Sequence, residues 1–355
     1  MSAKPRPDDI EARRNEYYAR VSERQLVPLW LFFKDWFTLE PHVRSLPHVW
    51  SYEALRETIL ESAGIVDPAE AERRVLALEN PGLPGRHLAT ESLYAGLQLM
   101  MPGEIAPSHR HTPSAMRFVL ESDSAYTAVN GERCYMKPGD FIITPAWTWH
   151  DHGHEGDGPT VWLDVLDVAM THLFNATFTE HYPDDSRPEA TEPLDTLYRY
   201  GMNMLPEGYE RDRGASPIFS YPYERTREVL ERLKDHSELD ACHGLKMEYV
   251  DPTTGGPAMP TISAHMQLLP AGFTTGSYRT TAGTIYCPVE GAGTVEFPGA
   301  ETPAIEYRPW DIFVVPSWKE FRIAADTEST IFSASDQAAQ AKLGMWREQR
   351  GPEGS

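Results

Sequence analysis

"SHRHTPSAMRF", residues 108–118, places two histidines one residue apart in a run whose composition favours a β-strand. Alternate side chains of a strand share a face, so we expect His109 and His111 to point the same way. A third histidine, His150, ends the strand-like run "DFIITPAWTWH", after a turn that contains proline. Three neutral imidazoles can hold one divalent metal ion and leave open positions for ligands that react on it. The sequence therefore predicts a metal site formed by these three histidines.

Composition limits the class of protein and its partners. The chain has 355 residues, a hydrophobic fraction of 41%, 25 glycines and 30 prolines, which fits a globular, turn-rich all-β protein. Its formal net charge of -21 argues against nucleic acid and anionic membranes as partners, but not against a small anionic substrate. Three cysteines without paired spacing, and no apolar run long enough for a signal or a membrane span, predict a cytoplasmic protein.

Hydrophobic periodicity divides the chain into helical and strand-rich parts. Helical spacing dominates the first 85 residues, where Asp67 and Pro68 open an expected helix through "AEAERRVLALEN". Short apolar runs follow, with Asn130-Gly131 as the turn pair of a β-hairpin, and further helices are expected at "YERTREVLERLKDH" and "SDQAAQAKLGMWREQR". The expected parts are a helical arm (1–85), a metal-binding barrel (86–183), a connection with one helix (184–255), a second barrel (256–335) and a C-terminal helix and tail (336–355).

The second strand-rich block repeats the first without its histidines. "PGEIAPSHRHTPSAMRFVLES" aligns with "AGFTTGSYRTTAGTIYCPVEG" without a gap, and "KPGDFIITPAWTWH" aligns with "RPWDIFVVPSWKEF". Tyr278, Thr280 and Phe321 stand where the first copy has its three histidines. Two copies of one small β-barrel are the simplest interpretation. Because the repeat loses all three histidines together, they are expected to act together in the first copy rather than to be paired by chance.

The same motifs resemble those of a known family. "GEIAPSHRH" and "GDFIITPAWTWH" resemble the two metal-binding motifs of the cupin superfamily, in which the first supplies two histidines and the second supplies another. The acidic ligand usual after the second histidine is absent, and Trp147 stands where glycine is usual. Both departures are traits of the bicupin gentisate and salicylate 1,2-dioxygenases, and the resemblance covers nearly the whole chain.

This resemblance implies a fold and a reaction. The fold is an all-β bicupin, two jelly-roll barrels with an N-terminal helical arm. The reaction is that of a three-histidine Fe(II) enzyme that uses O₂ as co-substrate to open a 2-hydroxybenzoate. The bond broken joins the carboxyl-bearing carbon to the hydroxyl-bearing one, so gentisate would give maleylpyruvate.

Two residues are candidates for catalytic contacts. Arg117 has the parity of His109 and His111, so on an unbroken strand it would point into the metal pocket and pair with a substrate carboxylate. A structural ion pair with an acidic side chain is the alternative. His152 shares parity with His150, and we expect it to hydrogen-bond the metal-bound phenolate or oxygen species and to manage a proton during ring attack. The alternative for His152 is a supporting or surface histidine.

Three further residues are candidates for the pocket wall. Asp164, in "VWLDVLD", is expected beside the site, where it would orient a histidine. Gln98, in "AGLQLM", would line the same barrel. Arg73, expected on the helical arm, would cap the pocket and add a positive contact to the substrate, although a solvated helix face fits the pattern equally well.

The substrate is less defined than the reaction. Pro113 stands where glutamine is usual in gentisate enzymes and Val165 where glycine is usual, and either can reshape the wall that contacts ring position 5. The alternatives are therefore another 5-substituted salicylate, such as 5-nitrosalicylate, and salicylate itself. Other classes are a bicupin that binds a small acid without reacting, and a cupin isomerase or decarboxylase. Imidazole ligands alone would also accept Mn, Ni, Co or Zn.

The arm predicts association between copies. Its run "LVPLWLFF" offers apolar surface beyond the needs of one barrel. Bicupins of this group usually associate, so a homotetramer is expected, with a homodimer as the alternative.

Overall fold

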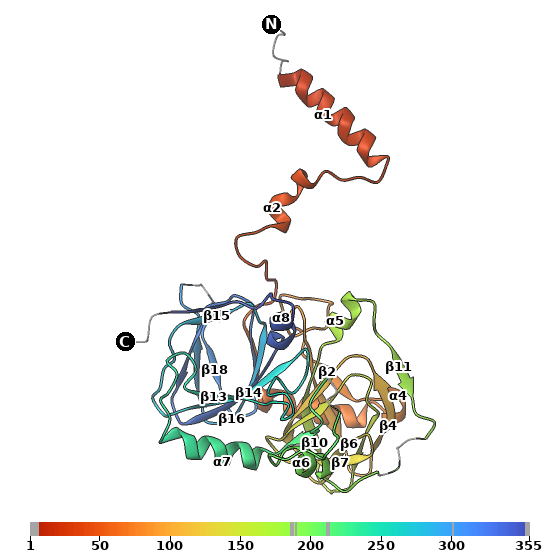
Figure 1. The fold of residues 1–355 in the computed structure, drawn as a ribbon, viewed down its shortest axis with the longest axis vertical. Coiled ribbons are helices and arrows are strands. Elements are labelled where there is room, and N and C mark those ends of the chain that lie inside the picture. The colour runs from red at the N-terminus through yellow and green to blue at the C-terminus, as the bar shows by residue number, and fades with distance from the viewer. Residues whose placement is uncertain (1–6, 185–187, 189, 211–213, 300–301, 352–355) are drawn as a thin grey trace. The chain divides into compact units, whose positions relative to one another are not determined.

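The computed structural model describes residues 7–184, 188, 190–210, 214–299 and 302–351, and it forms two compact units, residues 1–42 and 43–355. The first unit is helical (Figure 1) and contains α1 (Pro7–Ser22), the short η1 (Leu29–Leu31) and α2 (Phe33–Trp36). None of residues 9–42 is buried. The second unit begins at Val43, inside the range expected for the arm. In the described part of the chain, no helix is long and apolar enough to cross a membrane.

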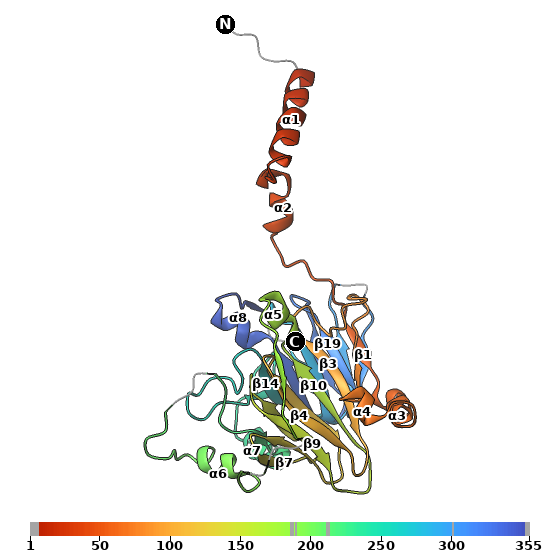
Figure 2. The ribbon, with the colours of Figure 1, turned by 90° about the vertical axis from the view of Figure 1, so that its right-hand side faces the viewer.

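Two six-stranded antiparallel sheets form the second unit's frame (Figure 2). In spatial order, the first large sheet contains β12 (Ser220–Tyr221), β8 (Phe141–Thr144), β5 (Ala115–Glu121), β10 (Thr160–Leu166), β3 (Tyr94–Met100) and β2 (Val75–Ala77). The second large sheet contains β1 (His48–Trp50), β19 (Ile312–Val315), β16 (Thr284–Glu290), β21 (Ser329–Ser335), β14 (Ser263–Leu269) and β13 (Leu245–Glu248).

Smaller sheets complete a barrel with each large sheet. The first barrel adds β11 (Thr179–His181), β4 (Ile105–His111), β9 (His150–His154), β6 (Ala125–Val129) and β7 (Glu132–Tyr135). The second barrel adds β18 (Ile305–Tyr307), β17 (Gly293–Glu296) and β20 (Arg322–Ala325), together with the pair β15 (Tyr278–Thr280) and β22 (Glu348–Arg350). The expected all-β architecture of two barrels is confirmed.

The two large sheets share one apolar core. Alternate residues of the strands face this core, and one cluster of buried side chains includes members from both sheets. Phe118 of β5 and Phe332 of β21 stack with ring centroids 4.0 Å apart, and both are almost completely buried. Burying one such ring stabilises the fold by about 1.5–3 kcal/mol. The barrels therefore stabilise each other through a continuous interior.

Each barrel is completed by the segment that precedes the other barrel. β1, which comes before the first barrel, pairs with β19 of the second, and β12, which comes before the second barrel, pairs with β8 of the first. A helix follows each of these strands, α3 (Tyr52–Glu61) and α7 (Tyr223–Lys234). The Tyr52 N–H donates to Asp311 at 3.0 Å, and the Tyr223 N–H donates to Asp140 at 2.8 Å. The internal repeat therefore extends into these flanking segments.

Two helices are shorter than the sequence predicts. The helix expected after Asp67 is only α4 (Pro68–Ala71), and the chain then forms β2, which pairs with β3. Pairing with an open sheet edge satisfies more backbone groups than a further turn of an exposed helix would. The last helix, α8 (Gln337–Lys342), ends before Gly344, whose φ of 71° terminates helices, and β22 follows. The helix expected at α7 and the hairpin turn at Asn130-Gly131 are both present.

Short elements complete the second unit. They are η2 (Ser62–Gly64), α5 (Val168–Leu173) and α6 (Asp195–Tyr200). α5 follows β10 directly and leads to β11, which pairs with β4 along the two histidines of that strand. In the second barrel, α8 leads in the same way to β22, which pairs with β15. The internal repeat therefore includes β11 and β22, the strands that pair with β4 and β15.

Candidate metal centre

A cavity of about 280 Å³ lies in the first barrel. Strands of both sheets of that barrel supply its wall, and α5 supplies Val168. Seven of the ten side chains predicted from the sequence line this cavity: Arg73, Gln98, His109, His111, Arg117, His150 and Asp164. The other three, His152, Pro113 and Val165, do not line it. The structure therefore gathers most of the predicted residues at one place.

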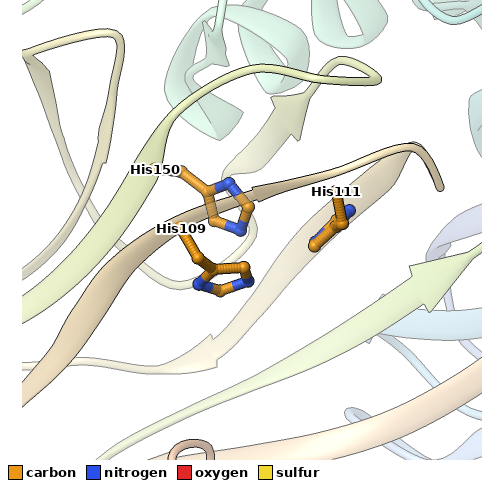
Figure 3. A group of neighbouring side chains, drawn as sticks. All are labelled: His109, His111 and His150. Carbon is orange, nitrogen blue, oxygen red and sulfur yellow. The ribbon is translucent and has the colours of Figure 1, made fainter. Parts of the chain in front are cut away.

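The three histidines converge from two neighbouring strands. His109 and His111 lie on β4, and His150 lies on β9 directly opposite His109 (Figure 3). One ring nitrogen from each lies within 4.8 Å of the others. Ring centroids are 5.2 Å apart for His109 and His111, and 4.3 Å apart for His109 and His150. Three imidazole nitrogens at such spacing can bind one ion from one side and leave the opposite side open.

Backbone carbonyls hold the histidine rings in position. The Nδ1 of His111 lies 2.7 Å from the Pro113 carbonyl, and the Nδ1 of His150 lies 3.0 Å from the Thr148 carbonyl. A carbonyl can only accept, so each Nδ1 carries the proton and donates it. The Nε2 atoms then keep their lone pairs for a metal ion. This donor set fits a divalent metal.

The histidines are neutral at ordinary pH. Burial, together with the nearby Arg73 and Arg117 cations, lowers the pKa of His109 to about 3 and that of His111 to about 4. Burial also holds the pKa of His150 well below its usual value. Neutral imidazole is the form that binds metal ions, so the site needs no deprotonation step before it takes one.

Arg73 reaches the site from a turn rather than from a helix, as α4 ends at Ala71. Its Nη2 lies 2.6 Å from the Pro107 carbonyl and 2.6 Å from Nδ1 of His109. The Pro107 carbonyl also lies 3.2 Å from the same Nδ1. A guanidinium only donates, so the two contacts of Nδ1 require opposite tautomers. The tautomer that donates to Pro107 keeps Nε2 free, as in the other two histidines.

Arg117 lies in the cavity wall, although the strand parity assumed for it does not apply. β4 ends at His111 and β5 begins at Ala115 in a different sheet, so the strand assumed in the sequence is broken. Arg117 is nevertheless buried in the cavity wall, donates to the Thr144 hydroxyl and lies beside Asp164. Asp164 sits directly opposite it on β10. The expectation that Asp164 orients a histidine is wrong, because its ionic partner is Arg117.

His152 lies two residues beyond His150 on β9 and is completely buried. Its Nδ1 lies 2.9 Å from the Thr127 hydroxyl, while its Nε2 has no hydrogen-bond partner. Its ring centroid is 6.0 Å from that of His150. Burial keeps the pKa of His152 well below its usual value, and Arg117 and Arg73 act in the same direction. A neutral ring with one free nitrogen beside a metal site can exchange a proton with a ligand.

The two specificity candidates lie outside the cavity wall. Pro113 acts through its carbonyl, which fixes His111. Val165 follows Asp164 on β10 and therefore points to the opposite face, where it is buried in the core between the large sheets. The expectation that Val165 shapes the wall is wrong for this reason. A glycine-to-valine difference there affects packing between the sheets.

Several residues of the cavity wall were not predicted from the sequence. Tyr94, Val75, Leu166 and Val168 line the cavity without carrying a motif. A signal existed for two of them, because Tyr94 shares the parity of Gln98 on β3 and Leu166 shares that of Asp164 on β10. Val75 and Val168 depend on β2 and on the start of α5, which the sequence did not predict. Together they add apolar side chains to a cavity wall that also carries charged groups.

The second barrel fills the equivalent space with aromatic rings. Tyr278 stands where the first barrel has His109, Phe321 where it has His150 and Tyr286 where it has Arg117. The ring of Phe321 lies 5.9 Å from Tyr278 and 6.2 Å from Tyr286. All three are buried. In the described part of the chain, the group of three or more His, Cys, Asp or Glu side chains that could hold a metal ion is the three-histidine cluster of the first barrel.

Comparison with known proteins identifies the family. A model of the cupin domain matches residues 96–166. The chain is 46% identical over 342 residues to gentisate 1,2 dioxygenase 1 of Aquipseudomonas alcaligenes, covering 96% of this chain and 97% of that protein. This chain belongs to the gentisate and salicylate 1,2-dioxygenase family of the cupin superfamily.

Other members of the dioxygenase family are similar along the whole chain. The 5-aminosalicylate 1,2-dioxygenase of a Comamonas species is 30% identical over 97% of this chain and 92% of its own. The crystal structure of salicylate 1,2-dioxygenase from Pseudoaminobacter salicylatoxidans, in its adduct with gentisate, matches with a TM-score of 0.89. The two chains are 31% identical, and the match covers 99% of this chain and 96% of that one. The protein is a ring-cleaving dioxygenase.

Proposed function

We propose that this dioxygenase uses Fe(II), bound by His109, His111 and His150, to open gentisate with O₂ and give maleylpyruvate. The observation that carries the proposal is that three neutral histidines and a buried arginine share one cavity. Relatives named for gentisate support this choice of substrate. The chemistry supplied by iron is activation of the ring and of oxygen while both are close together.

The side chains of the cavity bind and orient the substrate. Arg117, which is buried and cationic, would bind the substrate carboxylate, and Gln98 and Arg73 add polar contacts from neighbouring parts of the wall. His152, which is buried beside His150 and does not line the cavity, would accept the proton of the ring 2-hydroxyl on its free Nε2. A cavity of about 280 Å³ has room for a single aromatic ring.

Oxygen uptake tests the proposal and its main alternative. The iron-loaded protein is given gentisate, salicylate and 5-nitrosalicylate in turn, while ultraviolet absorbance follows ring opening. Uptake with gentisate, together with the absorbance band of a ring-opened keto acid, is the expected result. Uptake only with a 5-substituted salicylate would show that this compound, and not gentisate, is the substrate. That outcome would agree with the similarity to a 5-aminosalicylate enzyme. No uptake with any of the three would contradict the dioxygenase proposal.

The proposal also includes the compartment and the oligomeric state of the protein. Cys134, Cys242 and Cys287 are all free and buried, which fits a reducing compartment such as the cytoplasm. The exposed apolar side chains of the arm support a homotetramer. Light scattering on the eluted protein gives the mass of the assembly directly.

A further inference from the structure

Arg110 lies between the two histidines of β4, and its side chain points to the other face of that strand. Its guanidinium carbon lies 4.5 Å from the ring centre of Trp147 and 4.6 Å from that of Trp149. A guanidinium at such a distance is attracted to an aromatic ring. The Arg110 Nε donates to Oε2 of Glu180 on β11 at 2.8 Å, and Nη2 donates to the same oxygen. We call these four residues the arginine clamp.

The strand pairing beside the histidines is irregular. The register of β4 against β9 shifts between Ala106 and His109, and the pair of His109 with His150 is the last one of this ladder. His111 therefore lies beyond the paired part. Regular ladder hydrogen bonds cannot fix its position relative to β9, so other contacts must do so.

Two contacts of Trp147 join the segments where the ladder ends. The Trp147 N–H donates to the His111 carbonyl at 2.7 Å, and the Trp147 ring contacts Arg110. Trp147 has a φ of 59°, in the left-handed region that bulky residues rarely adopt. This conformation costs free energy, which its contacts must offset. Loss of the Arg110 side chain would remove one of these two supports from the turn that leads to His150.

The second barrel keeps part of the arginine clamp. Arg279 stands where the first barrel has Arg110, and its guanidinium carbon lies 4.6 Å from the ring centre of Trp318. Trp318 is the counterpart of Trp147 and has a φ of 58°. Its N–H donates to the Thr280 carbonyl at 2.6 Å. The turn itself is therefore built in the same way in both barrels.

The other two members of the arginine clamp differ between the barrels. Glu320 stands where the first barrel has Trp149. Gln349 pairs with Arg279 as Glu180 pairs with Arg110, and it accepts a hydrogen bond from Arg279 at 2.8 Å. The second aromatic ring and the carboxylate thus belong to the barrel that carries the histidines. An arginine and one tryptophan are enough for the turn, so the two added members have a further role.

We infer that Arg110 is a positioning residue of the metal centre, an inference that rests on the metal function proposed for the three histidines. Through the arginine clamp it holds β4, β11 and the turn before β9 at the spacing that three imidazoles need to bind one ion. Arg110 does not line the cavity, so it acts through the strands and touches neither metal nor substrate.

Cobalt binding tests this role without turnover. Co(II) is titrated into the metal-free, full-length protein, calorimetry gives the affinity, and the visible absorption spectrum reports the coordination geometry. Arg110→Met keeps an apolar stem against the tryptophan rings but removes the charge and the donors. It is expected to weaken Co(II) binding by about tenfold or more and to change the spectrum.

Two conservative variants extend the test. Arg110→Lys keeps the charge without the planar fork of donors and is expected to recover part of the lost affinity. Glu180→Gln introduces the amide that the second barrel has at this position and is expected to weaken Co(II) binding less than Arg110→Met does. Circular dichroism checks that each variant is folded.

Arg279→Met is the matched control. It removes the equivalent contact with Trp318 from the barrel that lacks the histidines. It is expected to leave the Co(II) affinity and spectrum unchanged, whatever its effect on the melting temperature. A merely structural role of the two arginines would instead make both variants act alike on metal binding.

The outcomes separate this inference from the proposed function. Normal Co(II) binding by the unmodified protein, with unchanged affinity and spectrum in Arg110→Met, would overturn the positioning role alone. Equal weakening by Arg110→Met and Arg279→Met would also overturn it. If Arg110→Met does not fold, unchanged Co(II) binding by both Arg110→Lys and Glu180→Gln would have the same meaning. No Co(II) binding by the unmodified protein would overturn the proposed metal function, and the positioning role with it.

Discussion

The Nε of Arg117 lies 3.6 Å from Oδ1 of Asp164, and neither atom has a hydrogen-bond partner. This separation is too long for a hydrogen bond, although the two residues face each other on paired strands. Burial raises the pKa of Asp164 to about 6 and lowers the pKa of Arg117, and the charge of each opposes the shift of the other. The pair is therefore an incomplete ion pair, and a substrate carboxylate can compete with Asp164 for the guanidinium.

Replacing Arg117 should weaken substrate binding while the metal stays bound. A hydrogen bond to a charged group contributes about 1.5–3 kcal/mol, so Arg117→Met should raise the dissociation constant of gentisate roughly 10- to 100-fold. Arg117→Lys keeps the charge and should recover part of that loss. Calorimetry on the metal-loaded protein, without O₂, measures the binding constant. An unchanged constant for Arg117→Met would make the residue purely structural.

Substrate binding should tighten as pH falls through the pKa of Asp164. Protonation near pH 6 removes the negative charge that competes with the substrate for Arg117, so affinity should rise between about pH 8 and pH 5. Asp164→Asn should bind more tightly at high pH and lose this dependence. The raised carboxyl pKa also means that Asp164 contributes stability at low pH that is lost as pH rises through about 6. A flat affinity profile for the unmodified protein would contradict the competition.

Removing one histidine should abolish metal retention. His111→Ala leaves two ligands, and we expect no metal after gel filtration, with a fold unchanged by circular dichroism. His265→Ala, which replaces a mostly buried histidine of the second barrel, is the matched control and should retain one metal per chain. Full metal content in His111→Ala would contradict the three-histidine site.

Replacing His152 should slow turnover without releasing the metal. His152 is adjacent to the ligand set but is not part of it, so His152→Gln should keep the metal and lower kcat by about 10²- to 10⁴-fold. Thr127→Val removes only the partner of Nδ1 and should have a smaller effect of the same kind. Metal analysis and steady-state kinetics on the same sample separate the two quantities. A change in KM alone would show that His152 only binds substrate.

A cavity between the large sheets should destabilise both barrels together. Phe332→Ala removes a stacked ring from the shared core and should cost about 3–5 kcal/mol of unfolding free energy. Urea titration should show one transition for the barrel unit, monitored by tryptophan fluorescence and by metal loss. Two transitions, with the metal site surviving the first, would contradict the shared core.

The sequence predicted the three-histidine cluster better than the cavity walls around it. His109, His111 and His150 could be found because a strand's two-residue period and an internal repeat are both visible in one chain. Arg117 reached the cavity although the strand continuity assumed for it was wrong, since β5 runs in another sheet. Val165 was misplaced because Asp164 beside it occupies the inward position. Val75 and Val168 depend on which strands and helices close the barrel, and this is set by long-range pairing.

Local propensity also failed where a sheet edge competed with it. The segment after Pro68 has helix formers, yet three residues join β3 because an exposed helix buries little. The same competition shortened α8 in favour of β22. Such outcomes depend on an edge that exists only after folding, so no window of sequence contains them.

The exchange of β1 and β12 between the barrels makes each barrel depend on the other. Each repeat copy lends its first strand to the other, so deleting either copy would leave its neighbour with a missing strand and an uncovered edge. Other residues at the histidine positions of the second copy leave this exchange of strands intact, whereas loss of the whole copy would not. The barrel without the histidines is therefore part of what holds the histidine-bearing barrel together.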